Sequence, residues 1–111
     1  MTSLSMMMDY VDAGKIGIEK MVQKMCHNPA ILYQIHNRGF LREGYAADIV
    51  LLGKSSEPVN KSNLLYKCGW SPFEGQVFSS KVLTTWVNGN KVYDNSHIIE
   101  GSLGSRLTFN R

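Results

Sequence analysis

The sequence predicts an α+β chain in which the helices precede the strands. In the first third of the chain, apolar residues recur at the spacing of an amphipathic helix. After Gly39 the pattern changes to short runs rich in Val, Ile and Leu that are bounded by turn residues. An Asn-Gly pair, Asn88 and Gly89, separates two such runs and is a strong hairpin signal. Gly39 therefore marks the expected change from helix to strand.

The first predicted helix ends at Gly14, because glycine readily adopts the left-handed conformation that terminates helices. Its apolar face consists of residues spaced i, i+3, i+4 and i+7, namely Leu4, Met7, Met8 and Val11. A second helix repeats the pattern with Ile18, Met21, Val22 and Met25. Methionine residues at this spacing usually fill a core, so we do not interpret this stripe of methionines along the two helices as a ligand surface.

A third, short helix is predicted after the second. Asn28 is the expected N-cap, and Pro29 suits the first helical position, where its missing N–H costs little. Gly39 is the expected residue just beyond the end of this helix.

Three β features are predicted in the rest of the chain. The run ADIVLLG, Ala47 to Gly53, is apolar and short, which is typical of a strand buried on both faces or nearly so. Val82–Val87 should pair with Asn90–Asp94 across the Asn-Gly turn. The polar segment 53–63, which contains Pro58, is expected to form a loop or an edge.

Composition limits the class of protein. A chain of 111 residues with 43% hydrophobic and 19% charged residues suits one soluble domain, and no apolar stretch approaches the ~20 residues of a membrane span. The start lacks the features of a signal peptide, so we expect a cytoplasmic location. The net charge of +3 is spread evenly, which argues against binding to nucleic acid.

Candidate catalytic and metal-binding residues are few and scattered. No CxxC, HxH or HExxH pattern links the potential ligands, which are Cys26, His27, His36, Cys68 and His97. No nucleophile has a base and an orienting acid near it in the sequence. We therefore expect no catalytic residue, no metal ligand and no cofactor-binding residue in this chain, and both cysteines to be reduced and buried.

The run KCGWSPFEG, Lys67 to Gly75, is the densest cluster of special residues. Pro72 fixes one backbone angle, while Trp70 and Phe73 supply apolar area, so we interpret the run as a turn held against an apolar surface. Glu74 is its only carboxylate, and one acid cannot form an acid/base pair.

Four segments together resemble the C-terminal end of a cyclic amidohydrolase, and most closely that of a dihydroorotase. They are KIGIEKMVQKMCHNPAILYQI, NRGFLREGYAADIVLL, LLYKCGWSPFEGQVFSSKV and TTWVNGNKVYDN. The ADIVL element occurs in many amidohydrolases. The combination of KCGWSPFEG with the VNGNKVYDN hairpin narrows the resemblance to the dihydroorotase, allantoinase and dihydropyrimidinase group.

The resemblance implies a fragment of a larger fold. Residues 1–38 would be the C-terminal outer helices of a (β/α)₈ amidohydrolase barrel, and residues 39–111 would be strands of the accessory β-sandwich. The parent enzyme would use zinc to interconvert N-carbamoyl-aspartate and dihydroorotate in pyrimidine biosynthesis. The zinc-binding segments of the family have no counterpart in this sequence, so we expect the chain alone to be inactive.

Alternatives remain open at this point. The parent could be an allantoinase or dihydropyrimidinase, or the chain could be a non-catalytic module that stabilises an amidohydrolase partner. The expected partners are the remainder of the amidohydrolase chain or further copies of this chain. A small-molecule substrate would be bound by the parent enzyme and not by this chain alone. No contact with nucleic acid or membrane is expected.

Overall fold

The structure, a computed structural model, describes residues 2–101 and 104–111. Helices precede strands, which confirms the predicted α+β order. The helical elements are α1 (Ser3–Asp12), α2 (Ile18–Val22), the π-helical turn η1 (Gln23–His27), α3 (Asn28–Leu32) and the 3₁₀ turn η2 (Lys61–Asn63). The strands are β1 (Ile49–Lys54), β2 (Ser80–Val87), β3 (Asn90–Asp94) and β4 (His97–Ile98).

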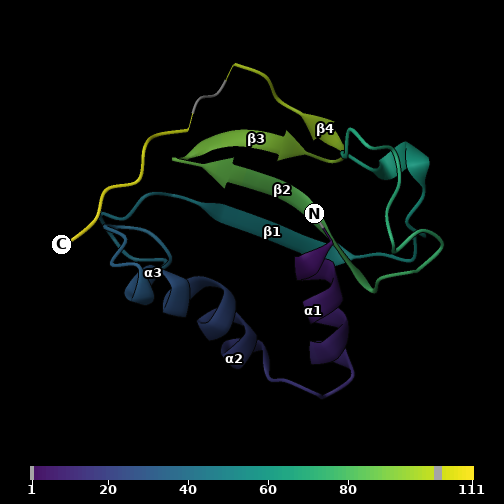
Figure 1. Cartoon of the computed structure of the whole chain (residues 1–111), viewed down its shortest axis with the longest axis horizontal. Helices are drawn as coiled ribbons and strands as arrows, with labels where there is room; N and C mark the ends of the chain where they lie inside the picture. The colour runs from purple at the N-terminus through teal and green to yellow at the C-terminus, as the bar shows by residue number, and fades with distance from the viewer. Residues whose placement is uncertain (1, 102–103) are drawn as a thin grey trace.

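The strands form one antiparallel sheet in the order β1-β2-β3-β4. In Figure 1 the first three helices are grouped on the β1 side of this sheet. Residues 104–111 lie near the end of α3, where Phe109 forms an isolated bridge with Ile35. No helix among the described residues is long and apolar enough to cross a membrane.

The end of α1 confirms the prediction made from Gly14. This glycine has a φ of +74° and donates its N–H to Val11 O at 3.0 Å, while Lys15 N donates to Tyr10 O at 2.9 Å. These two bonds satisfy carbonyl groups that the helix leaves without partners. Met8 is buried against the rest of the chain, as the stripe predicts.

The predicted break before Asn28 is wrong. Asn28 has helical angles (φ −61°, ψ −42°), so it is not an N-cap, and the helix runs on from Ile18 to Leu32. Pro29 cannot donate to the carbonyl four residues earlier, and the π-helical turn just before it widens the backbone at that point. A helix can thus pass through a proline that the sequence pattern assigns to its start.

The helix also ends earlier than predicted. Gln34 takes up the left-handed conformation with a φ of +55° and donates its N–H to Ile31 O at 3.1 Å. Gly39 has a φ of +85° but lies beyond this end, where it packs against the helix instead of terminating it.

β1 forms where the ADIVLLG run predicts a strand, but the predicted burial is wrong. β1 lies at the edge of the sheet, and Ile49, Val50 and Leu51 are 37%, 43% and 49% exposed. The buried hydrophobic residues of the described chain are only Met8, Met21, Ala30 and Phe78. The apolar run therefore meets no covering layer within the described residues.

The predicted hairpin is confirmed. β2 and β3 pair in antiparallel register with Val87 opposite Asn90, and β2 begins two residues earlier than expected, at Ser80. Asn88 and Gly89 have φ values of +52° and +78°, the positive angles that a two-residue hairpin turn requires.

We expect Gly89→Val to destabilise the chain by about 1–2 kcal/mol, because a β-branched residue resists positive φ. A Cβ at this position would meet only Ala47 Cβ at 3.9 Å, so the cost comes from the backbone and not from a clash. Urea unfolding followed by circular dichroism measures it. Unchanged stability would show that the turn does not depend on positive φ.

Candidate functional site: a polar junction between helices and sheet

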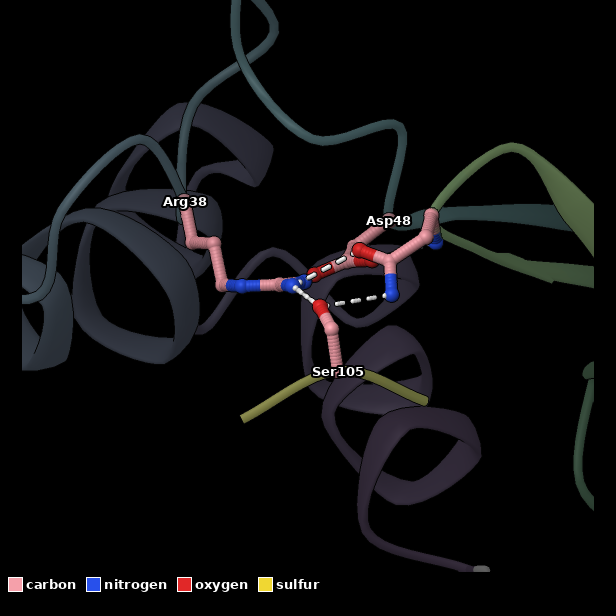
Figure 2. Close-up of polar contacts among 4 residues, drawn as sticks. Arg38, Asp48 and Ser105 are labelled. Atoms are coloured by element: carbon pink, nitrogen blue, oxygen red, sulfur yellow. Dashed lines mark hydrogen bonds and ion pairs between the residues drawn. The ribbon is translucent and has the colours of Figure 1, made fainter. Parts of the chain in front are cut away.

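Four polar side chains from distant parts of the sequence meet at one end of the sheet. Arg38 follows the long helix, Asp48 directly precedes β1, Asn88 lies in the hairpin turn and Ser105 belongs to the C-terminal segment. Figure 2 shows Arg38 reaching from the helical side toward Asp48 and Ser105. We call this group the polar junction.

Arg38 is the centre of the polar junction. Its Nη1 donates to Asp48 Oδ2 in an ion pair, and its Nη2 donates to Asn88 Oδ1 at 2.7 Å and to Ser105 Oγ at 2.8 Å. The Arg38 side chain is only 14% exposed. A guanidinium in this setting holds three chain segments together with charge-assisted hydrogen bonds.

Asn88 is the second hub. Its side-chain nitrogen donates to Ser105 Oγ at 2.9 Å, and its backbone N–H donates to Asp48 Oδ1 at 2.9 Å. The neighbouring Gly89 N donates to Ala47 O at 3.0 Å. The Asn-Gly pair thus serves both the hairpin and the attachment of the turn to the start of β1.

The C-terminal segment is attached by backbone bonds as well. His36 N donates to Thr108 O at 2.8 Å, and Asn110 N donates to Gln34 O at 2.8 Å. These bonds carry the segment past the end of α3 and bring Ser105 into reach of Arg38. Ser105 therefore joins the polar junction through long-range pairing.

The charge of Asp48 is stabilised in the folded state. Burial raises the pKa of Asp48, but the Asn88 N–H and the Arg38 guanidinium together outweigh it and hold that pKa below its ordinary value. The junction is therefore ionic at neutral pH, with a carboxylate that accepts from both the helical side and the hairpin.

Asp48 should make stability depend on acid pH. Because its folded pKa is below its unfolded pKa of about 4, its contribution is complete above that pH and is lost as the pH falls through the folded value. We expect the difference in unfolding free energy between the wild type and Asp48→Asn to shrink as the pH falls below about 4. Denaturant titrations at a series of pH values measure this, with Glu43→Gln as the exposed control. A difference that does not change with pH would contradict the assignment.

A cavity of about 350 Å³ lies between the N-terminal end of α1 and the sheet. Its apolar walls include Phe78, Val82 and Val92, and Lys81 Nζ pairs with Glu57 Oε1 at 3.3 Å in its lining. This cavity offers apolar area and a single ion pair, which suits packing of another chain segment better than acid/base chemistry.

The candidate ligands singled out from the sequence do not come together. His27 stacks on Phe40, His36 Nδ1 bonds to Asn110 Oδ1 at 2.6 Å, and His97 Nδ1 lies 3.0 Å from Asn95 O. Among residues 2–101 and 104–111, no three or more His, Cys, Asp and Glu side chains are grouped so that they could hold a metal ion.

The two cysteines are free thiols, but the prediction that they are buried is wrong. Cys26 and Cys68 are both exposed. Cys26 lies in the π-helical turn, and Cys68 Sγ is 3.5 Å from Trp70 O in the Lys67–Gly75 segment. Few of the described residues are buried at all, and both thiols lie at the surface.

The Lys67–Gly75 segment is a turn, as predicted, with Gly69 and Gly75 in left-handed conformations. The Phe73 ring packs against Phe78 at a centroid distance of 5.8 Å, whereas Trp70 is 60% exposed. One aromatic ring therefore docks on the chain, and the other projects from it.

Two residues of the polar junction, Asn88 and Asp48, belong to sequence patterns with another meaning, whereas Arg38 and Ser105 carry no signal of their own. Asn88 belongs to the Asn-Gly turn signal, and Asp48 belongs to the ADIVL strand motif. Ser105 lies in the GSLGSR run, which carries no motif. No local signal identifies Ser105, because its partner Arg38 is 67 residues away in sequence.

The chain matches the Amidohydrolase family over residues 1–92. The dihydroorotase of Pyrococcus furiosus is 33% identical over 107 residues, which are 96% of this chain and 26% of that protein. The dihydroorotase of Endomicrobium trichonymphae is 37% identical over 94 residues, which are 83% of this chain and 22% of that protein. The chain thus spans about a quarter of the length of the curated relatives that it matches.

A solved structure agrees with these matches. The L-hydantoinase (dihydropyrimidinase) of Arthrobacter aurescens aligns with a TM-score of 0.78 and 31% identity, over 88% of this chain and 22% of that one. The family match covers more than half of the chain, and the fold of a solved relative agrees with it. This chain therefore belongs to the Amidohydrolase family.

Proposed function

We propose that this chain is the C-terminal part of a dihydroorotase-type zinc amidohydrolase, the enzyme class that interconverts N-carbamoyl-aspartate and dihydroorotate. The main support for this proposal is the match to the Pyrococcus furiosus dihydroorotase, at 33% identity over 96% of the chain. The family membership and the antiparallel sheet support it further. The chain's role is then to complete a fold whose active site lies in another part of the polypeptide.

In this proposal, residues 1–38 are outer helices of the barrel and residues 39–111 are strands of the accessory β-sandwich. The change from helix to strand after Gly39 supports the division. The polar junction would then fasten one domain to the other, because Arg38 belongs to the helical part and Asp48 and Asn88 to the sheet.

Zinc would be held by residues outside this chain. The described residues do not fit a zinc site, since their histidines and cysteines are dispersed and do not form a group of three or more potential ligands. We therefore derive no catalytic step from the residues of this chain.

The remainder of the amidohydrolase polypeptide is the proposed partner. The exposed edge strand β1 and the exposed Trp70 ring are apolar surfaces of the kind that another segment covers. The cavity beside α1 offers a third such surface. If the remainder is absent, these surfaces should drive self-association of the chain.

A sister specificity is the second candidate, and the likeness to the L-hydantoinase of Arthrobacter aurescens favours it. The 31% identity to that protein is close to the 33% identity to the Pyrococcus furiosus dihydroorotase. A hydantoinase-type parent would hydrolyse a different cyclic amide with the same fold.

An exchange of segments tests the proposal. The region of the Pyrococcus furiosus dihydroorotase that matches this chain is replaced by residues 1–111, and loss of dihydroorotate is followed by ultraviolet absorbance. We expect the chimera to retain turnover, the deletion of the region to abolish it, and the isolated chain to show none. Turnover by the isolated chain that survives repurification would contradict the proposal.

A further inference from the structure

A second cluster of polar and aromatic side chains lies near the end of α3, apart from the contacts of the polar junction. The Phe40 ring stacks on the His27 imidazole at a centroid distance of 4.3 Å and an interplanar angle of 8°. The Arg42 guanidinium carbon lies 4.0 Å from the centre of the same ring. Two groups so close to one ring must occupy its opposite faces, so Phe40 is held between them.

The Arg42 guanidinium is positioned by aromatic rings instead of by a carboxylate. Besides Phe40, the Tyr45 ring lies 5.6 Å away, and Arg42 Nη1 is 3.5 Å from Tyr45 Oη. No salt bridge to Arg42 occurs among the described residues. Stacking on aromatic faces restricts the guanidinium while its N–H fork keeps donors for a further partner.

The Phe40, Arg42 and Tyr45 side chains line an open cavity of about 400 Å³, within the size range of small-molecule sites. Its apolar wall includes Ala30, Ile31 and Ile35 from the end of the helix. Arg38 also borders the cavity, but its guanidinium already forms an ion pair with Asp48. The described residues that line the cavity include no Asp or Glu side chain.

Two amide side chains add further donors. Asn110 Oδ1 bonds to His36 Nδ1, which leaves the Asn110 amide nitrogen without a partner among the described residues. Gln34 also lines the cavity, and its side-chain amide has no hydrogen bond within the described part of the chain. The cavity therefore combines one unpaired cation, spare N–H donors and an apolar wall.

We propose that this cavity binds a small carboxylate with an apolar body, such as an aromatic acid. The planar fork of Arg42 matches the two oxygens of a carboxylate in a bidentate pair. The single unpaired charge balances one carboxylate, whereas a phosphate dianion would keep an uncompensated charge. The wall formed by Ala30, Ile31 and Ile35 accepts the apolar body.

The test uses the 111-residue chain and benzoate, followed through backbone amide shifts in NMR spectra. We expect saturable shifts at Gln34, Arg42 and Tyr45, with a Kd on the order of 1 mM. Benzamide has the same shape without the charge and should bind about 10-fold more weakly, as should benzoate to Arg42→Gln. Arg42→Lys keeps the positive charge but loses the planar fork of N–H donors. Its affinity for benzoate should be lower by about 3-fold or more.

Arg106→Gln is the matched control, since Arg106 is another exposed arginine and does not line the cavity. We expect less than about a 2-fold change in benzoate affinity for this variant. Thermal unfolding of each variant shows whether it is folded. If Arg42→Gln does not fold, the affinity of Arg42→Lys for benzoate decides the test. The proposal would be overturned if the Arg106 and Arg42 variants lost benzoate affinity equally, or if benzamide bound as tightly as benzoate. It would also be overturned if no shifts appeared up to about 20 mM benzoate, well above the expected Kd.

Discussion

Gly39→Ala should destabilise the chain by about 3 kcal/mol or more. Gly39 has a φ of +85°, and a Cβ there would lie 2.5 Å from Ala30 Cβ and 2.9 Å from the Cys26 carbonyl oxygen. The substitution therefore adds backbone strain to a clash with the helix that passes beneath it. Ala30 is buried and Cys26 O belongs to the helix backbone, so neither can move aside cheaply.

Gly44→Ala is the matched control for this prediction. Gly44 has a similar φ of +80°, but a Cβ there would meet nothing within 4 Å. Gly44→Ala should therefore cost only the free energy of placing an alanine in the left-handed conformation, about 1 kcal/mol. Urea unfolding of both variants measures the difference. Equal losses for Gly39→Ala and Gly44→Ala would show that the close approach of Gly39 to the helix does not exist.

Arg38→Met should destabilise the chain by about 2 kcal/mol, the second largest effect that we expect. The change removes the ion pair to Asp48 and the hydrogen bonds to Asn88 and Ser105, while methionine keeps much of the aliphatic volume. The partial exposure of Asp48, at 35%, keeps the loss below that for a fully buried pair.

A double-mutant cycle isolates the ion pair from the other contacts of Arg38. Arg38→Met combined with Asp48→Asn should lose less than the sum of the two single changes, by about 1 kcal/mol. Arg106→Met serves as the exposed control and should change stability by no more than about 0.5 kcal/mol. Strict additivity of the two losses would mean that Arg38 and Asp48 do not act together.

The features predicted correctly from the sequence are those fixed by neighbouring residues. Gly14 ends α1, and Asn88-Gly89 forms the hairpin turn, because each needs only a local backbone angle. The predicted break before Asn28 is wrong, because a π-helical turn can absorb the hydrogen bond that Pro29 cannot donate and no local pattern indicates that turn.

The remaining differences concern contacts made over long distances in the chain. An apolar run such as that of β1 indicates a covering layer but does not say whether the layer belongs to the same chain, and the described residues supply none. Both cysteines likewise meet no covering layer among the described residues. The roles of Ser105 and Gly39 depend on which segments the fold brings together, and neither carries a motif that would reveal it.

The most direct test is the size of the polypeptide that carries these 111 residues in its source cell. An antibody raised against the chain, combined with intact-mass measurement, identifies that polypeptide. If the chain is part of a dihydroorotase-type enzyme, the antibody should detect one polypeptide about four times as long, since the chain covers 26% of its Pyrococcus furiosus relative. A species of 12.5 kDa that stays monomeric at high concentration and binds no hydrophobic dye would contradict that assignment.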